Sequence, residues 1–370
     1  HGIMDKVVFI KADIGDESLV GPLLKGQDYL FNLAGQISHV GSMKDPYADL
    51  QANGLSQLTL LEMCGKYNPE VRIVYSSTRQ IYGKTQYLPV DENHPLAPVD
   101  MNGVSKLTGE CYHLVSHRVN KLQTSILRMT NVYGPRMRVR DAYKSFIGFW
   151  IRQLIEGKEL PVFGTGRQIR DFNYVDDVVN ALLLTAAEPA AIGQVYNLGA
   201  EPISLLELAE LMIEINGSGS YRLEPFPLER KRIDIGDYYG NYSKIKEQLG
   251  WIPRTSLRNG LTSTIDYYRA NREYYFLMNI PFLDLKAQYH RLRPQIDSAI
   301  HRVLEGGQFI LGEEVARLES EFASFCEVKH AVTVANGTEA IQLALIGCGI
   351  RRGEEVITST FTAVATVAAI

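Results

Sequence analysis

Three hydroxyl-bearing residues, Ser76-Ser77-Thr78, directly follow the apolar segment Val71–Tyr75. We interpret that segment as a buried parallel strand, and ligands of open α/β sheets bind at the carboxyl ends of such strands. Hydroxyl groups in that place donate hydrogen bonds to substrate oxygens. In an ordinary turn they satisfy their own backbone instead. Taken alone, the run fits both interpretations equally.

Two further polar clusters occur at comparable places. Asn131–Arg136 follows the apolar segment Ser125–Met129, which is the next predicted strand. Arg167–Phe172 precedes Tyr174–Val178. Because the carboxyl ends of parallel strands share one edge of a sheet, we expect the three clusters to converge there.

The elements that would carry these clusters alternate between strands and helices. We predict buried strands at Val7–Ile10 and Tyr29–Leu33, besides the two above, and helices at Ala48–Tyr67 and Gly103–Val119. That alternation predicts an α/β fold, with an open parallel sheet covered by helices on both faces.

A second, smaller layer of structure is expected further along the chain. From Gly157 onward the sequence is richer in Pro and Gly and its elements are shorter. Leu205–Ile215 and Ser243–Leu249 are predicted helices of a small cap, and Leu261–Tyr275 is a predicted closing helix.

Composition excludes several classes of protein. The 370 residues have a formal charge of −4, from 38 Lys and Arg against 42 Asp and Glu, so neither nucleic acid nor an anionic membrane is expected as a partner. The four cysteines lack metal-ligand spacing, so no metal site is expected and a reducing, cytoplasmic compartment fits best. The apolar segment Val356–Ile370 is too short to span a membrane, and we predict a buried strand and the start of a helix there. Since the chain opens at His1 and stops inside that segment, we expect a fragment.

Taken in order, the three clusters resemble the nucleotide-sugar epimerase/dehydratase branch of the extended short-chain dehydrogenase/reductase family. The resemblance covers roughly Lys6 to Tyr275. It implies a Rossmann-like parallel sheet with a small α+β substrate-binding cap. It also implies NAD as cofactor, a nucleotide-diphosphate sugar as substrate, and a homodimer.

The resemblance assigns roles to individual residues. Thr78 aligns with the catalytic hydroxyl that binds the sugar oxygen being oxidised, and Lys106 with the catalytic lysine that holds the nicotinamide ribose. The cofactor-binding positions, from the adenine to the nicotinamide end, are Asp13, Ile14, Leu33, Ala34, Gly35, Asn53, Ser76 and Lys106. The positions that match substrate-diphosphate contacts are Asn131, Arg170 and Arg232.

The sequence departs from the family pattern in two respects. The family's Tyr-x-x-x-Lys motif places tyrosine four residues before the lysine, but Asn102 stands there, and an amide exchanges no proton near neutral pH. Another base, for which Tyr82 is a candidate, must then serve, or this member has changed or lost its chemistry. The glycine-rich turn of the first βαβ unit would lie before His1, so we expect a sheet that lacks this unit and an incomplete NAD site.

The two residues after Thr78 also distinguish between reactions. The family's sugar 4,6-dehydratases carry Asp and Glu there, because eliminating water needs an acid and a base. Arg79 and Gln80 provide neither, so a 4,6-dehydratase is less favoured than an epimerase or ketoreductase.

The C-terminal part resembles the start of a DegT-type sugar aminotransferase, a fold-type I pyridoxal phosphate enzyme. The matching segments are Pro281–Leu285, Gly312–Val315 and Asn336–Ala340. Gly337 and Thr338 would hold the phosphate and Phe361 would stack on the pyridine ring, although an ordinary helix N-cap also explains Asn336–Ala340. Pyridoxal phosphate is implied only for the complete domain.

These observations lead to one assignment with alternatives. We expect an NAD-dependent epimerase/dehydratase-like domain at residues 1–276, with its cap mainly from about 157, and a partial aminotransferase segment at residues 278–370. The function expected is that of a nucleotide-sugar 4-epimerase acting through transient oxidation. The alternatives are a dehydratase or ketoreductase, a bifunctional epimerase/aminotransferase, and a non-catalytic nucleotide-sugar binder.

Overall fold

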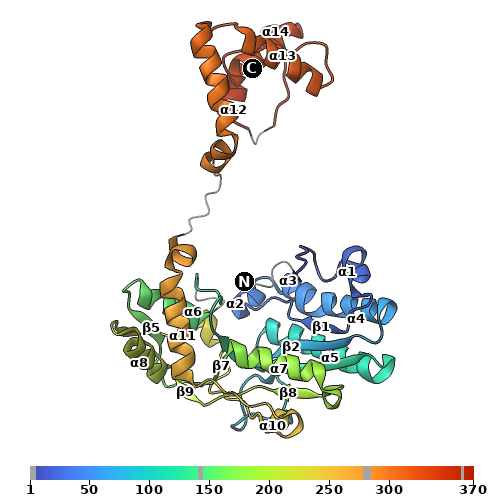
Figure 1. The fold of residues 1–370 in the computed structure, drawn as a ribbon, viewed down its shortest axis with the longest axis vertical. Coiled ribbons are helices and arrows are strands. Elements are labelled where there is room, and N and C mark those ends of the chain that lie inside the picture. Colours follow the sequence, from blue (N-terminus) through green and yellow to red (C-terminus); the bar gives the residue numbers. More distant parts are fainter. Residues whose placement is uncertain (1–5, 141–144, 278–284, 360–361) are drawn as a thin grey trace. The chain divides into compact units, whose positions relative to one another are not determined.

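A computed structural model describes residues 6–140, 145–277, 285–359 and 362–370 (Figure 1). The chain divides into two compact units, His1–Met278 and Asn279–Ile370. The first unit contains all of the strands in the described residues, and the second contains only helices and connecting segments there.

The centre of the first unit is a parallel sheet in the order β1-β2-β3-β8. Its strands are β1 (Tyr29–Asn32), β2 (Arg72–Thr78), β3 (Gln123–Met129) and β8 (Val195–Asn197). The predicted strands at Tyr29–Leu33, Val71–Tyr75 and Ser125–Met129 are therefore confirmed. Thr78 pairs with Met129 in the register of β2 and β3, so both strands end at the same edge.

Helices cover both faces of this sheet (Figure 1). α1 (Glu17–Leu24), α4 (Ser56–Tyr67) and α5 (Met101–Asn120) lie on one face, where Leu61, Met63 and Ile73 are part of one buried cluster. α7 (Val175–Ala187) and α10 (Ser243–Leu249) cover the other face, around Trp251 and Tyr196. The central strands β2 and β3 are thus covered on both sides, as the continuous apolar runs predict, whereas β1 is only partly buried.

The helix α5 has clear start and stop signals. The Asp100 side chain accepts a hydrogen bond of 2.7 Å from the Gly103 N–H, which caps its first turn. Lys121, at φ 62°, ends it in a left-handed conformation. A π-helical turn, η2 (Gln51–Leu55), joins α3 (Pro46–Leu50) to α4, and such turns are frequent at functional sites.

The cap packs around its own apolar core, which includes Trp150, Ile151, Leu208 and Ile265. Its helices are α6 (Phe146–Ile155), α8 (Leu205–Asn216), α9 (Leu228–Lys231) and α11 (Leu257–Ala270). Three strand pairs accompany them: β5 (Leu160–Phe163) with β10 (Tyr221–Glu224), β4 (Asn131–Tyr133) with β7 (Phe172–Tyr174), and β6 (Ile169–Arg170) with β9 (Ile203–Ser204). The short remaining elements are α2 (His39–Lys44), η3 (Arg79–Tyr82), η4 (Pro189–Ala191) and η5 (Glu273–Leu277).

The predicted strand at Val7–Ile10 is wrong. These residues have no regular secondary structure, and the Phe9 side chain is 87% exposed. A strand needs a neighbour for its backbone N–H and C=O groups. In the described residues β1 pairs only with β2, and Val7–Ile10 pairs with no strand.

The second unit consists of α12 (Leu285–Gly306), α13 (Glu313–Phe325), α14 (Gly337–Gly347) and α15 (Val364–Ala369). The buried strand predicted after Val356 is wrong, because this segment is irregular and Ile357 is fully exposed. The described part of the unit supplies no strand for it to pair with. The predicted helix start is confirmed as α15.

Candidate active site

The carboxyl end of β2 presents the hydroxyl residues in alternating directions. Ser77 points to the α5 side, where its Oγ donates a hydrogen bond of 2.7 Å to Glu110 Oε2. Ser76 Oγ lies 3.3 Å from Met129 Sδ on β3. Thr78 ends the strand, and its Oγ1 accepts a hydrogen bond of 3.3 Å from the Gln80 N–H as the cap of η3. The Thr78 hydroxyl proton remains available to a ligand at this edge.

Lys106 on α5 brings a buried amine to the same strand end. Its side chain is 6% exposed, and Nζ donates a hydrogen bond of 3.2 Å to the Ser76 carbonyl oxygen. Nζ also lies 5.2 Å from the centroid of the Tyr75 ring. Burial lowers the pKa of Lys106 to about 8, although the Asp49 carboxylate acts in the opposite direction.

Asn53 and Asn102 both donate hydrogen bonds to the same two acceptors, the Asp49 carboxylate and the Gln36 carbonyl. The Asn102 Nδ2 group donates to Gln36 O at 2.9 Å and to Asp49 Oδ1 at 3.0 Å. Asn53 Nδ2 donates to the same two oxygens, at 3.0 Å and 3.2 Å. The Gln36 N–H returns a hydrogen bond of 3.1 Å to Asn53 Oδ1. These bonds fix the loop after β1 against α3 and α5.

Gly35, in this loop, forms a cradle that a side chain would fill. A Cβ atom there would lie 2.4 Å from Asn53 Oδ1 and 2.9 Å from Lys106 Nζ. Only glycine brings the backbone so close to both groups while leaving the loop surface open to a ligand. Together with the spare Lys106 donors, this cradle fits the nicotinamide ribose of NAD.

The other cofactor positions lie on nearby loops. Leu33 and Gly35 are exposed and Ala34 is partly exposed, so the loop after β1 presents its backbone to a ligand. Asp13 is exposed, and its Oδ1 accepts a hydrogen bond of 2.8 Å from the Gly15 N–H in a local turn, while Ile14 is partly buried. The turn interpretation of Asp13 is thus structurally satisfied, and its contact with adenine stays a prediction.

Tyr82, the alternative base, is fully buried in a separate network. Its hydroxyl donates to Asn197 Oδ1 at 2.6 Å and accepts from the Arg128 guanidinium at 2.7 Å. Burial raises the pKa of Tyr82 to about 12. Arg128 in turn pairs with Glu110, which binds Ser77, so this network stabilises the end of β2 on the side that faces α5.

The predicted substrate residues lie between β4, β6 and the cap. Asn131 Oδ1 accepts a hydrogen bond of 3.1 Å from Arg79, and Asn131 Nδ2 donates to the Asp171 carbonyl at 3.0 Å. Arg170 donates hydrogen bonds to the Ile169 and Gly236 carbonyls and to Asp234 Oδ1. Most of its guanidinium donors are therefore already bound within the cap.

Two guanidinium groups therefore share this region. Burial first, and then the nearby Arg79 charge, lower the pKa of Arg170 to about 10. Arg79 Nε is buried and has no hydrogen-bond partner among the described residues. A bound anion would relieve both the repulsion and the unpaired donor.

Four predicted positions remain, of which one lies on the cap and three belong to the second unit. Arg232 is exposed at the C-terminal end of α9. Gly337 and Thr338 begin α14, where the Asn336 side chain accepts a hydrogen bond of 3.0 Å from the Glu339 N–H, so the N-cap interpretation describes this turn. Phe361 lies outside the described residues.

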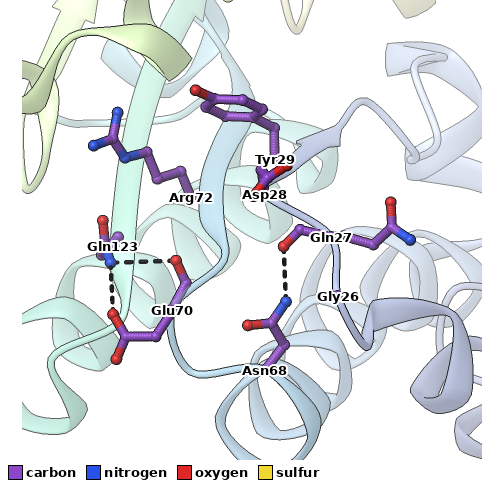
Figure 2. Close-up of a pocket in the computed structure, with 8 residues that line it drawn as sticks. All are labelled: Gly26, Gln27, Asp28, Tyr29, Asn68, Glu70, Arg72 and Gln123. Atoms are coloured by element: carbon purple, nitrogen blue, oxygen red, sulfur yellow. Dashed lines mark hydrogen bonds between the residues drawn. The ribbon is translucent and has the colours of Figure 1, made fainter.

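A polar hollow of about 510 Å³ lies at the opposite end of the sheet (Figure 2). Asp28 precedes β1, while Tyr29 begins β1, Arg72 begins β2 and Gln123 begins β3, so these residues mark the amino ends of the strands. Several of its polar groups bind one another, as Gln123 binds Glu70. The hollow is therefore distinct from the Thr78 edge.

The described residues contain neither a cluster of metal ligands nor a helix that could span a membrane. Within the described ranges, no three His, Cys, Asp or Glu side chains gather as metal ligands. No helix in the part of the chain that the structure describes is long and apolar enough to cross a membrane.

Sequence reasoning missed Asp49 and Gln36. Asp49 and Asn53 are four residues apart in a helical segment, and this spacing places both side chains on one face. That pattern was a usable signal for Asp49. Nothing in the sequence indicates that the Gln36 carbonyl returns to meet them.

A parallel sheet that is covered by helices on both faces, with a threonine and a buried lysine near its strand ends, defines a Rossmann-like α/β protein. Residues 1–199 match the model of the NAD dependent epimerase/dehydratase family, and residues 290–370 match that of the DegT/DnrJ/EryC1/StrS aminotransferase family. The chain belongs to the NAD-dependent epimerase/dehydratase family, which is a family of enzymes.

Individual relatives cover most of the first unit. A putative UDP-glucose 4-epimerase of Methanocaldococcus jannaschii is 32% identical over 73% of this chain and 87% of its own. A UDP-glucose 4-epimerase structure with UDP-glucose from Thermotoga maritima has a TM-score of 0.67 at 31% identity, over 73% and 86% of the two chains. A UDP-glucuronic acid 4-epimerase from Bacillus cereus, in complex with UDP-glucuronic acid and NAD, has a TM-score of 0.63 at 30% identity, over 71% and 82%. Other relatives are named dTDP-glucose 4,6-dehydratases.

Proposed function

We propose that the first unit is an NAD-dependent nucleotide-sugar 4-epimerase. The observation that carries this proposal is the position of Lys106, which binds the Ser76 carbonyl two residues before Thr78 at the carboxyl end of β2, beside the Gly35 cradle. NAD, when bound, supplies reversible hydride acceptance. The epimerase names among the relatives support the reaction type.

The chain's own residues would divide the work at this edge. Thr78 would orient the sugar hydroxyl through its free proton and oxygen lone pairs. Lys106 would hold the nicotinamide ribose with the donors that it does not spend on Ser76. Arg170 and Asn131 would hold the diphosphate, so that the oxidised sugar can rotate and present its other face while the nucleotide stays bound.

The residues after Thr78 favour epimerisation over dehydration. Gln80 is buried and donates a hydrogen bond of 2.9 Å to Asp100 Oδ2, so it faces its own helix cap. Arg79 donates to Asn131. Neither side chain offers the acid and base that elimination of water requires.

Arg79 also favours a more specific substrate as a second candidate. Its buried Nε has no hydrogen-bond partner among the described residues, and Arg79 follows Thr78 directly in the chain. A guanidinium in that position fits a carboxylate on the sugar. Together with the relative that binds UDP-glucuronic acid, this supports a nucleotide uronic acid as the alternative to UDP-glucose.

The remaining assignments belong to the same proposal. We assign residues 1–276 to this enzyme and residues 278–370 to a partial aminotransferase segment. Pyridoxal phosphate enters only through a complete second domain, where Gly337, Thr338 and Phe361 would serve it. A homodimer in the cytoplasm is the proposed state.

The test uses the protein in a form that calorimetry shows to bind NAD, together with either UDP-glucose or UDP-glucuronic acid, and the products are resolved by anion-exchange chromatography. Thr78→Val should lower kcat by about 10²–10³-fold, as for loss of a group that stabilises developing charge. The matched control is Thr185→Val, because Thr185 is buried on α7 and its Oγ1 has no hydrogen-bond partner within the part of the chain that the structure describes. Binding of both sugars without any product would instead identify a non-catalytic binder.

A further inference from the structure

Because Asn102 stands where the family has its tyrosine, the group that accepts the proton of the sugar hydroxyl has to be another residue. We propose that Lys106 itself is the catalytic base, taking the proton of the sugar hydroxyl directly. This inference rests on the proposed epimerase function and adds a second duty to Lys106.

The geometry of Asn102 leaves room for this assignment. Both protons of its amide are committed, one to the Gln36 carbonyl and one to Asp49 Oδ1. The side chain is 2% exposed, and its backbone N–H binds Ser42 Oγ at 3.1 Å. Asn102 is therefore a positioning residue, whose amide is committed to the Gln36 loop and to Asp49.

Lys106 reaches the required place. The Ser76 carbonyl that receives its hydrogen bond lies two residues before Thr78 on the same strand. The Ser76 carbonyl and Thr78 are two residues apart at the end of this extended strand, a separation of roughly 7 Å. A sugar hydroxyl bound to Thr78 would be met there by the Lys106 amine once it turns from the Ser76 carbonyl toward the strand end.

The other buried titratable groups in this region are unsuited to the role. Tyr82 is held by Arg128 and Asn197. Burial raises the pKa of Tyr75 far above neutrality, and its ring is stacked on His113 with centroids 4.3 Å apart. His113 Nδ1 bonds the Gly109 carbonyl, and burial lowers its pKa to about 4, so it stays neutral and is fully covered.

The charges around Lys106 suit an amine that gains and loses a proton. Asp49 on α3 supplies a buried carboxylate, one oxygen of which has no hydrogen-bond partner among the described residues. Tyr75 faces Lys106 from β2, and Glu110 on α5 is already paired with Arg128 of β3. The other charged groups on adjacent elements are turned elsewhere: His39 of α2 lies against Asp100, Arg79 of η3 binds Asn131, and Glu62 and Lys66 of α4 are exposed.

Burial makes the neutral amine accessible near neutral pH. A pKa of about 8, in place of the ordinary 10.5, raises the fraction of neutral amine at pH 7 more than a hundredfold. Asp49 then stabilises the ammonium ion once it has formed. Asp49 is thus a positioning and electrostatic residue that acts through Lys106.

The step balances in protons and electrons. As the sugar O–H bond breaks, the proton moves to the Lys106 Nζ lone pair, and the C–H electron pair leaves as hydride to NAD⁺, giving a keto-sugar, NADH and an ammonium ion. The positive charge lost by the nicotinamide ring reappears on Lys106, so the net charge of the site is unchanged. The return step reverses each transfer on the other face of the sugar.

The first experiment measures the protonation of Lys106 in the full chain, without turnover. Lysines labelled with ¹³C at Cε are titrated by NMR, and Lys106→Arg identifies the signal. We expect a midpoint near 8, and Lys66, whose pKa Glu17 holds above its ordinary value, gives the internal comparison. Asp49→Asn should lower the Lys106 midpoint further, whereas Asp177→Asn, at a buried aspartate on α7, should leave it unchanged. A Lys106 midpoint above 10 would overturn the proposal.

The second experiment compares turnover of UDP-sugars with NAD in wild type and Lys106→Arg. Arginine keeps the positive charge and its hydrogen bonds but accepts no proton near neutrality. We expect kcat to fall by about 10²–10⁴-fold, with nucleotide-sugar affinity within threefold, and wild-type kcat to rise with pH along the lysine titration. Turnover retained within threefold in Lys106→Arg would refute only the base assignment. A wild type that binds NAD in calorimetry but shows no turnover at any pH would refute the epimerase function itself, and the proposed base with it.

Discussion

A buried ion pair beneath the strand end gives the sharpest test of how this site is supported. Glu110 and Arg128 have side chains only 1% and 5% exposed. Glu110 also accepts the Ser77 hydroxyl at 2.7 Å, next to Thr78. Glu110→Ala leaves the Arg128 guanidinium buried without its carboxylate. We expect this to lower the free energy of unfolding of the first unit by about 3–5 kcal/mol.

A surface pair with similar geometry is the control. Arg258 donates two hydrogen bonds, each of 2.9 Å, to Glu214, but the two side chains are 54% and 63% exposed. Water screens that pair, so Glu214→Ala should cost less than about 1 kcal/mol. The double variant Glu110→Ala/Arg128→Met should recover part of the loss, because it removes the stranded charge.

Urea unfolding followed by tryptophan fluorescence measures this free energy. Both tryptophans, Trp150 and Trp251, are buried in the first unit, so the signal reports on that unit. A loss for Glu110→Ala that equals the loss for Glu214→Ala would refute the argument that burial sets the cost. A double variant less stable than Glu110→Ala would refute the stranded-charge explanation.

Three further results are expected. Arg170→Ala should weaken UDP-glucose binding about 10–150-fold by calorimetry, the effect of losing one charge-assisted hydrogen bond, whereas the exposed Arg167→Ala should change it less than threefold; equal effects would remove Arg170 from the diphosphate site. Burial raises the pKa of Cys64 to about 12, so a thiol reagent at pH 8 should modify the exposed Cys111, Cys326 and Cys348 in the native chain and Cys64 only after unfolding, and native modification of Cys64 would contradict its burial. Burial lowers the pKa of His113 to about 4, so as pH falls from 6.5 to 4 the unfolded chain binds a proton that the folded chain does not. The free energy of unfolding, measured by urea titration, should therefore drop over that pH range by up to about 3 kcal/mol. His113→Gln should make this drop smaller.

The parts of the fold that sequence predicted correctly are those decided by local burial. The apolar runs that became β2 and β3 are each covered by helices on two faces, so their composition alone marks them as strands. Val7–Ile10 has the same composition but no adjacent strand in the described sheet, and its side chains are exposed. An apolar run therefore predicts a strand only where a neighbour completes its hydrogen bonds.

The site shows a similar division. Thr78 and Lys106 were predictable because each follows from a position on an element, a strand end and a helix face. The partners of Asn102 were not, since its two acceptors are 66 and 53 residues away and meet it only after the loop beyond β1 returns. Side-chain chemistry that depends on such long-range closure is absent from local sequence patterns.

Asn102 replaces the tyrosine of the family's Tyr-x-x-x-Lys motif, and α5, which carries the motif, keeps its helical structure. A tyrosine there would have to place its ring where Asn102 now meets Asp49 and the Gln36 carbonyl, and it has one donor where the amide has two. The amide therefore joins Asn53 in fixing the Gly35 loop, and Asp49 stays buried beside Lys106. The same substitution that removes one proton carrier thus assembles the electrostatic surroundings in which a lysine can become another.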